Sequence, residues 1–282
     1  MLFAFAAYGL WGFAPVYWKL LRAAPASELL AQRVLWSLGV GALLIAVTGR
    51  WRELAGALRS RRQLLPIVAS SLLIGINWLI FIEAVNSGRV LATSLGYFLN
   101  PLVNVLLGVV FLGERLTGGQ RIAVAIGCAG VTVWAVDLGE APWIALSLAA
   151  SFGLYGLVRK VAAVTPLVGF TLETLLLAPP ALAYLAQLAA DGGMTLPRES
   201  LGVKALVAGA GVITAGPLLC FTSAARRLPL STLGFFQYLA PSISFLLAVG
   251  LYGEPFGRSQ AIAFSCVWAA LALFSFASRR PR

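Results

Sequence analysis

Residues 101–114 read PLVNVLLGVVFLGE, and residues 241–254, which lie 140 positions later, read PSISFLLAVGLYGE. At this spacing, ten residues between positions 101 and 137 are identical to their counterparts, without a gap. Shared apolar composition accounts for matches among Leu, Val and Ala, but not for the aligned Pro, Gly-Glu and Gln. GLWG at 9–12 and GLYG at 153–156 match at nearly the same spacing. We interpret these matches as an internal repeat.

The apolar runs that contain these stretches are long enough to cross a bilayer, which takes about 20 residues of helix. The sequence predicts ten such helices, at about residues 2–22, 28–48, 64–85, 90–112, 119–137, 142–158, 167–189, 203–224, 230–252 and 259–278. The runs are continuously apolar, whereas strands of a membrane barrel alternate between apolar and polar residues. We therefore predict an all-α integral membrane protein. The segments 50–62 and 191–202 are its only sizeable loops.

The composition leads to the same class. Hydrophobic residues make up 60% of the 282 residues and charged residues 11%, whereas a soluble domain carries about 25% charged residues. The formal charge of +11 first suggests a nucleic-acid partner. That function needs basic residues gathered on a solvated face, and the long apolar runs argue against it. We expect a lipid bilayer and a small molecule as partners, and no nucleic acid.

The residues that carry most catalytic chemistry are missing. The chain has no histidine, which excludes His-based triads and His–metal sites. Its three cysteines, Cys128, Cys220 and Cys266, are far apart and lie within apolar runs, so they match no metal-ligand spacing. No lysine completes a phosphate-binding GxxxxGK[ST] motif. We expect no metal, no cofactor and no enzymatic activity.

The distribution of basic residues predicts the orientation. An even number of spans places both termini on the same side. If that side is the cytoplasm, 14 of the 21 Lys and Arg residues lie inside and six outside, while Arg33 falls within a span. Cytoplasmic loops are enriched in Lys and Arg, so we predict that both termini are cytoplasmic.

The repeat gives the predicted spans an internal symmetry. Residues 1–137 and 142–278 would each form a repeat of five helices. Because five is odd, Glu114 falls in an inside loop and its counterpart Glu254 in an outside loop, so the two repeats are inverted relative to each other. Inverted repeats are typical of secondary transporters, where they allow alternating access to a central site. We predict ten transmembrane helices in two inverted five-helix repeats.

A few charged residues lie within the predicted spans. A charge at the bilayer centre costs at least ~2.5–3.5 kcal/mol on insertion scales and therefore indicates function. Arg33 is the main candidate for a substrate site, with a structural ion pair as the alternative. Glu28, Glu83 and Glu173 are candidates for charge or proton coupling. As alternatives, Glu28 would sit favourably at a helix N-terminus, and Glu83 would reach the outer interface.

Polar and aromatic residues cluster in corresponding parts of the two repeats. The segments 96–101 and 234–241 both end in proline, and Gly and Pro interruptions at matching places point to a binding site. Close helix packing is the alternative. With Arg33, the candidates for lining a substrate cavity are Trp11, Tyr17, Asn77, Trp78, Tyr97, Asn100, Gln237 and Tyr238. Trp51, Trp134 and Trp143 lie at predicted boundaries and are expected at the membrane interface.

Several of these motifs are shared with a known family. Residues 94–104 (SLGYFLNPLVN), 155–160 (YGLVRK) and 231–238 (STLGFFQY), together with Glu28, Arg33 and Asn77-Trp78, resemble the EamA-type permeases of the drug/metabolite transporter superfamily. The resemblance covers essentially the whole chain. It implies ten helices in two inverted repeats, a bacterial inner membrane, and a permease linked to chloramphenicol sensitivity.

Two positions depart from the family pattern. Relatives usually carry an acid just before SLGYF, where this chain has Ala92-Thr93, and an aromatic residue where it has Glu83. Proton coupling through that acid is therefore in doubt here. We predict a secondary transporter that moves a small organic solute by alternating access. The alternative is a translocator of lipids or lipid-linked carriers, which would need a lateral opening.

Overall fold

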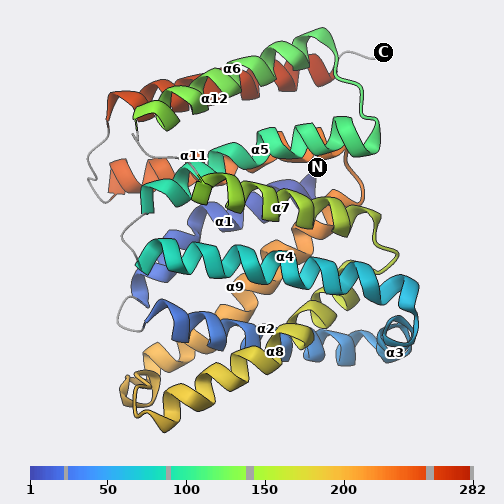
Figure 1. Cartoon of the computed structure of the whole chain (residues 1–282), viewed down its shortest axis with the longest axis vertical. Helices are drawn as coiled ribbons and strands as arrows, with labels where there is room; N and C mark the ends of the chain where they lie inside the picture. Colours follow the sequence, from blue (N-terminus) through green and yellow to red (C-terminus); the bar gives the residue numbers. More distant parts are fainter. Residues whose placement is uncertain (22–24, 87–89, 138–142, 252–256, 280–282) are drawn as a thin grey trace.

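The computed structural model describes residues 1–21, 25–86, 90–137, 143–251 and 257–279, and these residues are organised into helices that run side by side (Figure 1). The long helices are α1 (Leu2–Leu20), α2 (Ala26–Thr48), α4 (Arg61–Asn86), α5 (Val90–Leu112), α6 (Gly118–Asp137), α7 (Trp143–Val161), α8 (Pro166–Ala190), α9 (Leu201–Ala225) and α12 (Arg258–Arg279). The shorter elements are α3 (Trp51–Arg59), η1 (Leu196–Arg198), α10 (Leu230–Gln237), α11 (Leu239–Leu246) and the π-helical turn η2 (Leu247–Leu251).

The structure confirms an all-helical protein with helices that could span a membrane. In the described part of the chain, eight helices are long and apolar enough to cross a bilayer, and Leu2–Trp18 of α1 is a shorter apolar helix. The predicted spans begin within three residues of the observed helices. Their large exposed side chains are apolar, for example Leu43, Val110, Val136 and Phe276. In water such a surface would aggregate, whereas in a bilayer it contacts acyl chains.

The ninth predicted span is not one continuous α-helix. α10 ends at Gln237, α11 begins at Leu239, and the segment finishes as η2. Pro241 lies in the first turn of α11 and lacks the N–H that would bond to the carbonyl of residue 237. In contrast, Pro101 lies inside the continuous helix α5.

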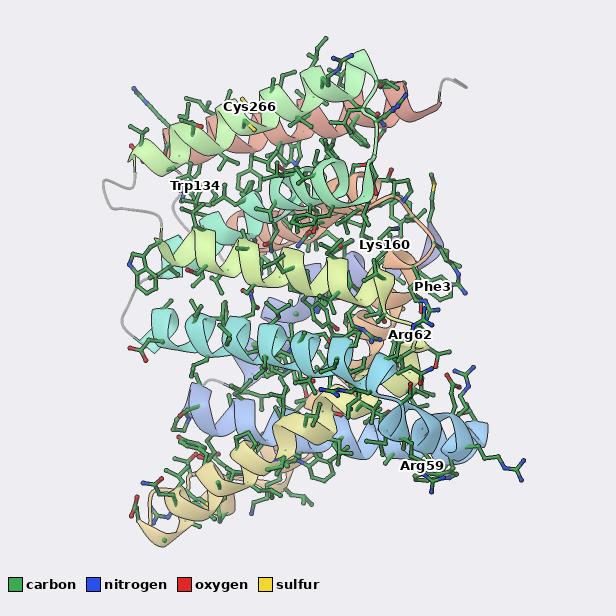
Figure 2. All side chains as sticks on the ribbon, turned by 45° about the vertical axis from the view of Figure 1, so that its right-hand side comes forward. Phe3, Arg59, Arg62, Trp134, Lys160 and Cys266 are labelled. Atoms are coloured by element: carbon green, nitrogen blue, oxygen red, sulfur yellow. The ribbon has the colours of Figure 1, made fainter. Side chains whose placement is uncertain are left out.

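The segment 50–62 was expected to be a loop but contains α3. The helix has only nine residues and exposes Arg52 and Arg59 to the surroundings, so it lacks the apolar run that identified the spans. It lies at the same end of the bundle as the start of α1 and the end of α12 (Figure 1). Arg59, Arg62 and Lys160 point to this end as well (Figure 2).

The helices pack in a few extensive pairs. α6 lies along α12 at one edge of the molecule and α2 along α8 at the other (Figure 1). Between them, α5 packs against α7 and α10, and α9 packs against α1 and α2. Trp134 of α6 was expected at the membrane interface, but it is buried, with its ring centroid 4.9 Å from that of Phe98 on α5. It fills the space between these two helices.

Candidate functional site

Arg33 lies on α2, seven residues after the helix begins, which places it about 10 Å along the axis. Its Nε donates a hydrogen bond of 2.7 Å to the Thr214 hydroxyl on α9. The guanidinium carbon lies over the rings of Trp78, 4.5 Å from the centroid, and Trp18, 5.5 Å from it. We refer to Arg33, Thr214, Trp18 and Trp78 as the Arg33 cluster. Cation–π contacts of this kind stabilise a cation by about 0.5–2 kcal/mol each.

The charge of Arg33 has no acidic partner among the residues that the structure describes. The ion pairs found there are Arg50 with Glu53 and Arg159 with Glu173. Tyr97 on α5 interacts electrostatically with Arg33, but it is neutral at ordinary pH. The ion pair that the sequence left as an alternative for Arg33 is therefore absent from the described residues.

Glu28 lies on the same helix but faces a different neighbour. Its carboxylate accepts hydrogen bonds from the backbone N–H groups of Thr195 and Leu196, both at 3.0 Å, and from the Thr195 hydroxyl at 2.6 Å. The side chain is buried. These bonds occupy both oxygens and fix the connection between α8 and α9 to the start of α2, which favours a structural role for Glu28.

We expect Glu28→Ala to destabilise the protein by about 1–3 kcal/mol, because it leaves the Thr195 and Leu196 donors without an acceptor. The loss is measured as a lower melting temperature of the detergent-solubilised protein. Asp191→Asn is the matched control, since Asp191 is an exposed carboxylate on the same connection. Its effect should stay within about 0.5 kcal/mol. Equal melting of Glu28→Ala and the parent protein would rule out this role.

Glu173 is the centre of a second buried group. It lies on α8, seven residues after that helix begins, and its Oε1 is 3.3 Å from Nε of Arg159 on α7. The Ser70 hydroxyl on α4 donates to Oε1 at 2.5 Å and the Tyr155 hydroxyl to Oε2 at 3.3 Å. We call these four residues the Glu173 cluster. Both charged side chains are buried, with 0% of Arg159 and 4% of Glu173 exposed.

The position of Arg159 differs from the sequence prediction, in which the span 142–158 ends before it and leaves it in a loop on the inside. α7 continues to Val161, so Arg159 belongs to its last turns and packs inward instead of facing water. Gly169 makes room for it: a Cβ atom at this position would overlap the guanidinium group.

Gly169→Ala should therefore force the Arg159 guanidinium away from Glu173 and cost about 1–3 kcal/mol of stability, as overpacking usually does. Urea unfolding or thermal melting in detergent measures the loss. Gly39→Ala on α2 is the control, because a Cβ atom there meets nothing within 4 Å. Similar stability of the two variants would show that Arg159 can move without cost.

Asn100 on α5, Gln237 at the end of α10 and Tyr238, which follows it, are all buried. Gln237 accepts a hydrogen bond of 2.8 Å from the side-chain amide of Asn104. The Oδ1 atoms of Asn100 and Asn104 and the Tyr238 hydroxyl are buried and make no hydrogen bond with the described residues. Buried polar groups are nearly always satisfied, so three such atoms without a partner among the described residues are unusual.

The other predicted cavity residues contribute to helix packing. Trp11 lies against Tyr8, Phe152 and Phe221 in an aromatic group. The Tyr17 hydroxyl donates to the Leu206 carbonyl of α9. Asn77 on α4 donates to the Leu148 carbonyl and the Ser151 hydroxyl of α7, both at 2.9 Å.

Glu83 is exposed near the end of α4. Of the residues predicted to line the cavity, Trp78 and Tyr97 are the ones that the structure places near Arg33. Trp18 and Thr214, which were not predicted, also contact Arg33.

The chain is similar to known transporters in sequence and to a solved structure in fold. The EamA-like transporter family matches residues 1–136. An uncharacterized transporter of Vibrio cholerae is 48% identical over 275 residues, covering 98% of this chain and 91% of that protein. Protein RarD of Salmonella typhi is 47% identical over 274 residues, covering 97% of this chain and 93% of that protein. One solved crystal structure, 22% identical, covers 99% of this chain and 98% of its own with a TM-score of 0.76, and so shares the fold.

Proposed function

This chain belongs to the EamA-like transporter family, among its RarD proteins, and from that premise we propose that it is a secondary transporter of a small organic solute. It is a multi-pass membrane protein similar to bacterial RarD, which supports a place in the bacterial inner membrane. The observation that carries the proposal is Arg33, a cation about 10 Å inside a spanning helix with aromatic neighbours and no described acidic partner. Such a residue is expensive in a bilayer and marks a substrate path.

We infer that the protein is built from two inverted repeats, residues 1–137 and 142–278. Helices of the two halves begin 140 residues apart, which supports the assignment: α2 and α8, α4 and α9, α5 and α10, and α6 and α12 start at positions 26 and 166, 61 and 201, 90 and 230, and 118 and 258. α10, α11 and η2 together would be the fourth span of the second repeat. α3 is an addition to the first.

The packing also supports exchange symmetry between the halves. Gly12 of α1 packs against Ile243 of α11, and a Cβ atom added to Gly12 would lie only 2.7 Å from the Ile243 side chain. Gly153 of α7 packs in the same way against Val103 of α5, where an added Cβ atom would also lie 2.7 Å from the side chain. Val103 and Ile243 are 140 positions apart. Each repeat thus inserts the glycine of its first span against the fourth span of the other, as two halves related by a two-fold axis would.

Arg33 and Glu173 occupy equivalent places in this symmetry, because they too are 140 positions apart. With both termini in the cytoplasm, which the basic inside loops favour, the Arg33 cluster lies in the outer half and the Glu173 cluster in the inner half. We propose that the Glu173 cluster closes the inner half in this conformation, since Ser70 of the first repeat bonds to Glu173 of the second. Rocking of the repeats would separate this contact and open the inner side.

A translocator of lipids or lipid-linked carriers is the second candidate. Tyr97, which interacts with Arg33, is 47% exposed, and a lipid substrate would need such a surface to open laterally to the bilayer. A flip assay with fluorescent phospholipids in vesicles would detect this activity.

The proposal is tested with protein-containing liposomes supplied with a deproteinised extract of bacterial metabolites and no nucleotide. A secondary transporter should accumulate or exchange at least one solute saturably, compared with protein-free liposomes, as followed by mass spectrometry. Lipid flipping without any movement of solutes would favour the second candidate. If the protein neither moved a solute nor flipped lipids, the result would contradict a transport function.

A further inference from the structure

The donors of Arg33 are mostly unused by the protein. A guanidinium has five N–H donors, and the described residues accept only one of them, the Nε–H that bonds to Thr214. The terminal nitrogens of Arg33 make no hydrogen bond to the described residues. The buried Arg159, in contrast, has the Glu173 carboxylate 3.3 Å from its Nε and donates one hydrogen bond to the Pro166 carbonyl. Arg33 therefore presents a planar donor edge that nothing in the described structure fills.

The described acids form no ion pair with Arg33. Glu28 lies five residues away on the same helix, and both of its carboxylate oxygens accept hydrogen bonds from Thr195 and Leu196. Glu173 is buried with Arg159, Ser70 and Tyr155. Glu83 is exposed near the end of α4. Among the residues that the structure describes, no carboxylate is therefore left to neutralise the charge of Arg33.

The side chains around Arg33 also indicate the chemical character of the rest of the ligand. Trp18 and Trp78 place apolar ring surface around the cation, and the nearest charged group on the same helix is occupied. A single uncompensated cation is neutralised by one negative charge, and a carboxylate matches the planar fork of arginine with two parallel hydrogen bonds.

We propose that the transported solute is a small organic monoanion whose carboxylate binds the terminal nitrogens of Arg33, with its apolar part against Trp18 and Trp78. This inference rests on the proposed transport function and names the substrate class of the same site. A neutral analogue would leave the cation uncompensated and would bind more weakly.

Benzoate and benzamide are suitable probes, because they share shape and ring but differ in charge. We expect benzoate to quench the tryptophan fluorescence of the purified protein with at least tenfold higher affinity than benzamide. Arg33→Gln should remove this preference, Arg33→Lys should keep part of it, and Trp78→Phe should reduce the signal. Melting curves verify that each variant is folded. Equal affinities, no detectable benzoate binding, or an unchanged preference in Arg33→Gln would overturn the proposal.

The liposome assay separates this inference from the proposed function. Transport of organic anions supports both. Transport restricted to neutral or cationic solutes overturns the anion assignment but leaves the transport function intact. Selective benzoate binding through Arg33 without transport of any solute supports the ligand chemistry and contradicts the transport function.

Discussion

Replacing Arg33 by glutamine is expected to lower solute flux at least about a hundredfold in liposomes while the protein remains folded. Glutamine keeps a polar side chain but removes the charge. Removing one partner of a buried, hydrogen-bonded charge pair costs about 2–5 kcal/mol, and each 1.4 kcal/mol is about tenfold in affinity. The measurement is the initial rate of uptake of a solute that the wild-type protein transports, with the melting temperature recorded in parallel.

Two further variants make the result specific. Arg33→Lys retains the charge without the planar fork and should fall between the wild type and Arg33→Gln. Arg52→Gln removes an exposed cation from α3 and should keep flux within about twofold, because surface charges contribute little. Wild-type flux in Arg33→Gln would exclude Arg33 from the solute path.

The second large effect is expected at Glu173. Glu173→Ala leaves Arg159, which is 0% exposed, as an unpaired charge and also removes the acceptor of Ser70 and Tyr155. Breaking a buried pair in this way typically destabilises by about 3–5 kcal/mol. We expect a strongly lowered melting temperature in detergent and poor yield of the variant.

A double variant distinguishes loss of the partner from loss of packing. Replacing a buried ion pair by apolar residues of similar size is often close to neutral, so Arg159→Met with Glu173→Leu should recover much of the stability. If the double variant is as unstable as Glu173→Ala, the unpaired charge is not the cause. If Glu173→Ala melts like the wild type, the Glu173 cluster does not stabilise this conformation.

Most of the helical framework could be predicted because a bilayer leaves few alternatives. Apolar length identifies each span, and local signals mark its ends, such as Gly49, which ends α2 in a left-handed conformation. α3 was missed because its nine residues are too few to form the long apolar run that identifies a span. The break after Gln237 could not be predicted from Pro241 alone, because the matching Pro101 does not interrupt α5.

The site could be predicted only in part. Arg33 was identifiable because a charge within an apolar run is costly by itself. The partners of Glu28 could not be, because Thr195 and Leu196 lie 167 and 168 residues away in the chain. Arg159 was misassigned because a basic residue near a helix end usually faces water. Its burial depends on the space left by Gly169 on the next helix.

Access to the Arg33 cluster from both sides of the membrane is the central claim, and it can be measured by cysteine labelling. Trp78→Cys, in a protein with Cys128, Cys220 and Cys266 replaced by serine, is treated with a membrane-impermeant thiol reagent in right-side-out and inside-out vesicles. Leu43→Cys, which is exposed on α2, serves as a control facing the acyl chains. Alternating access predicts that position 78 is labelled from either side and position 43 from neither. Labelling of position 78 from one side only, or from none, would contradict the account.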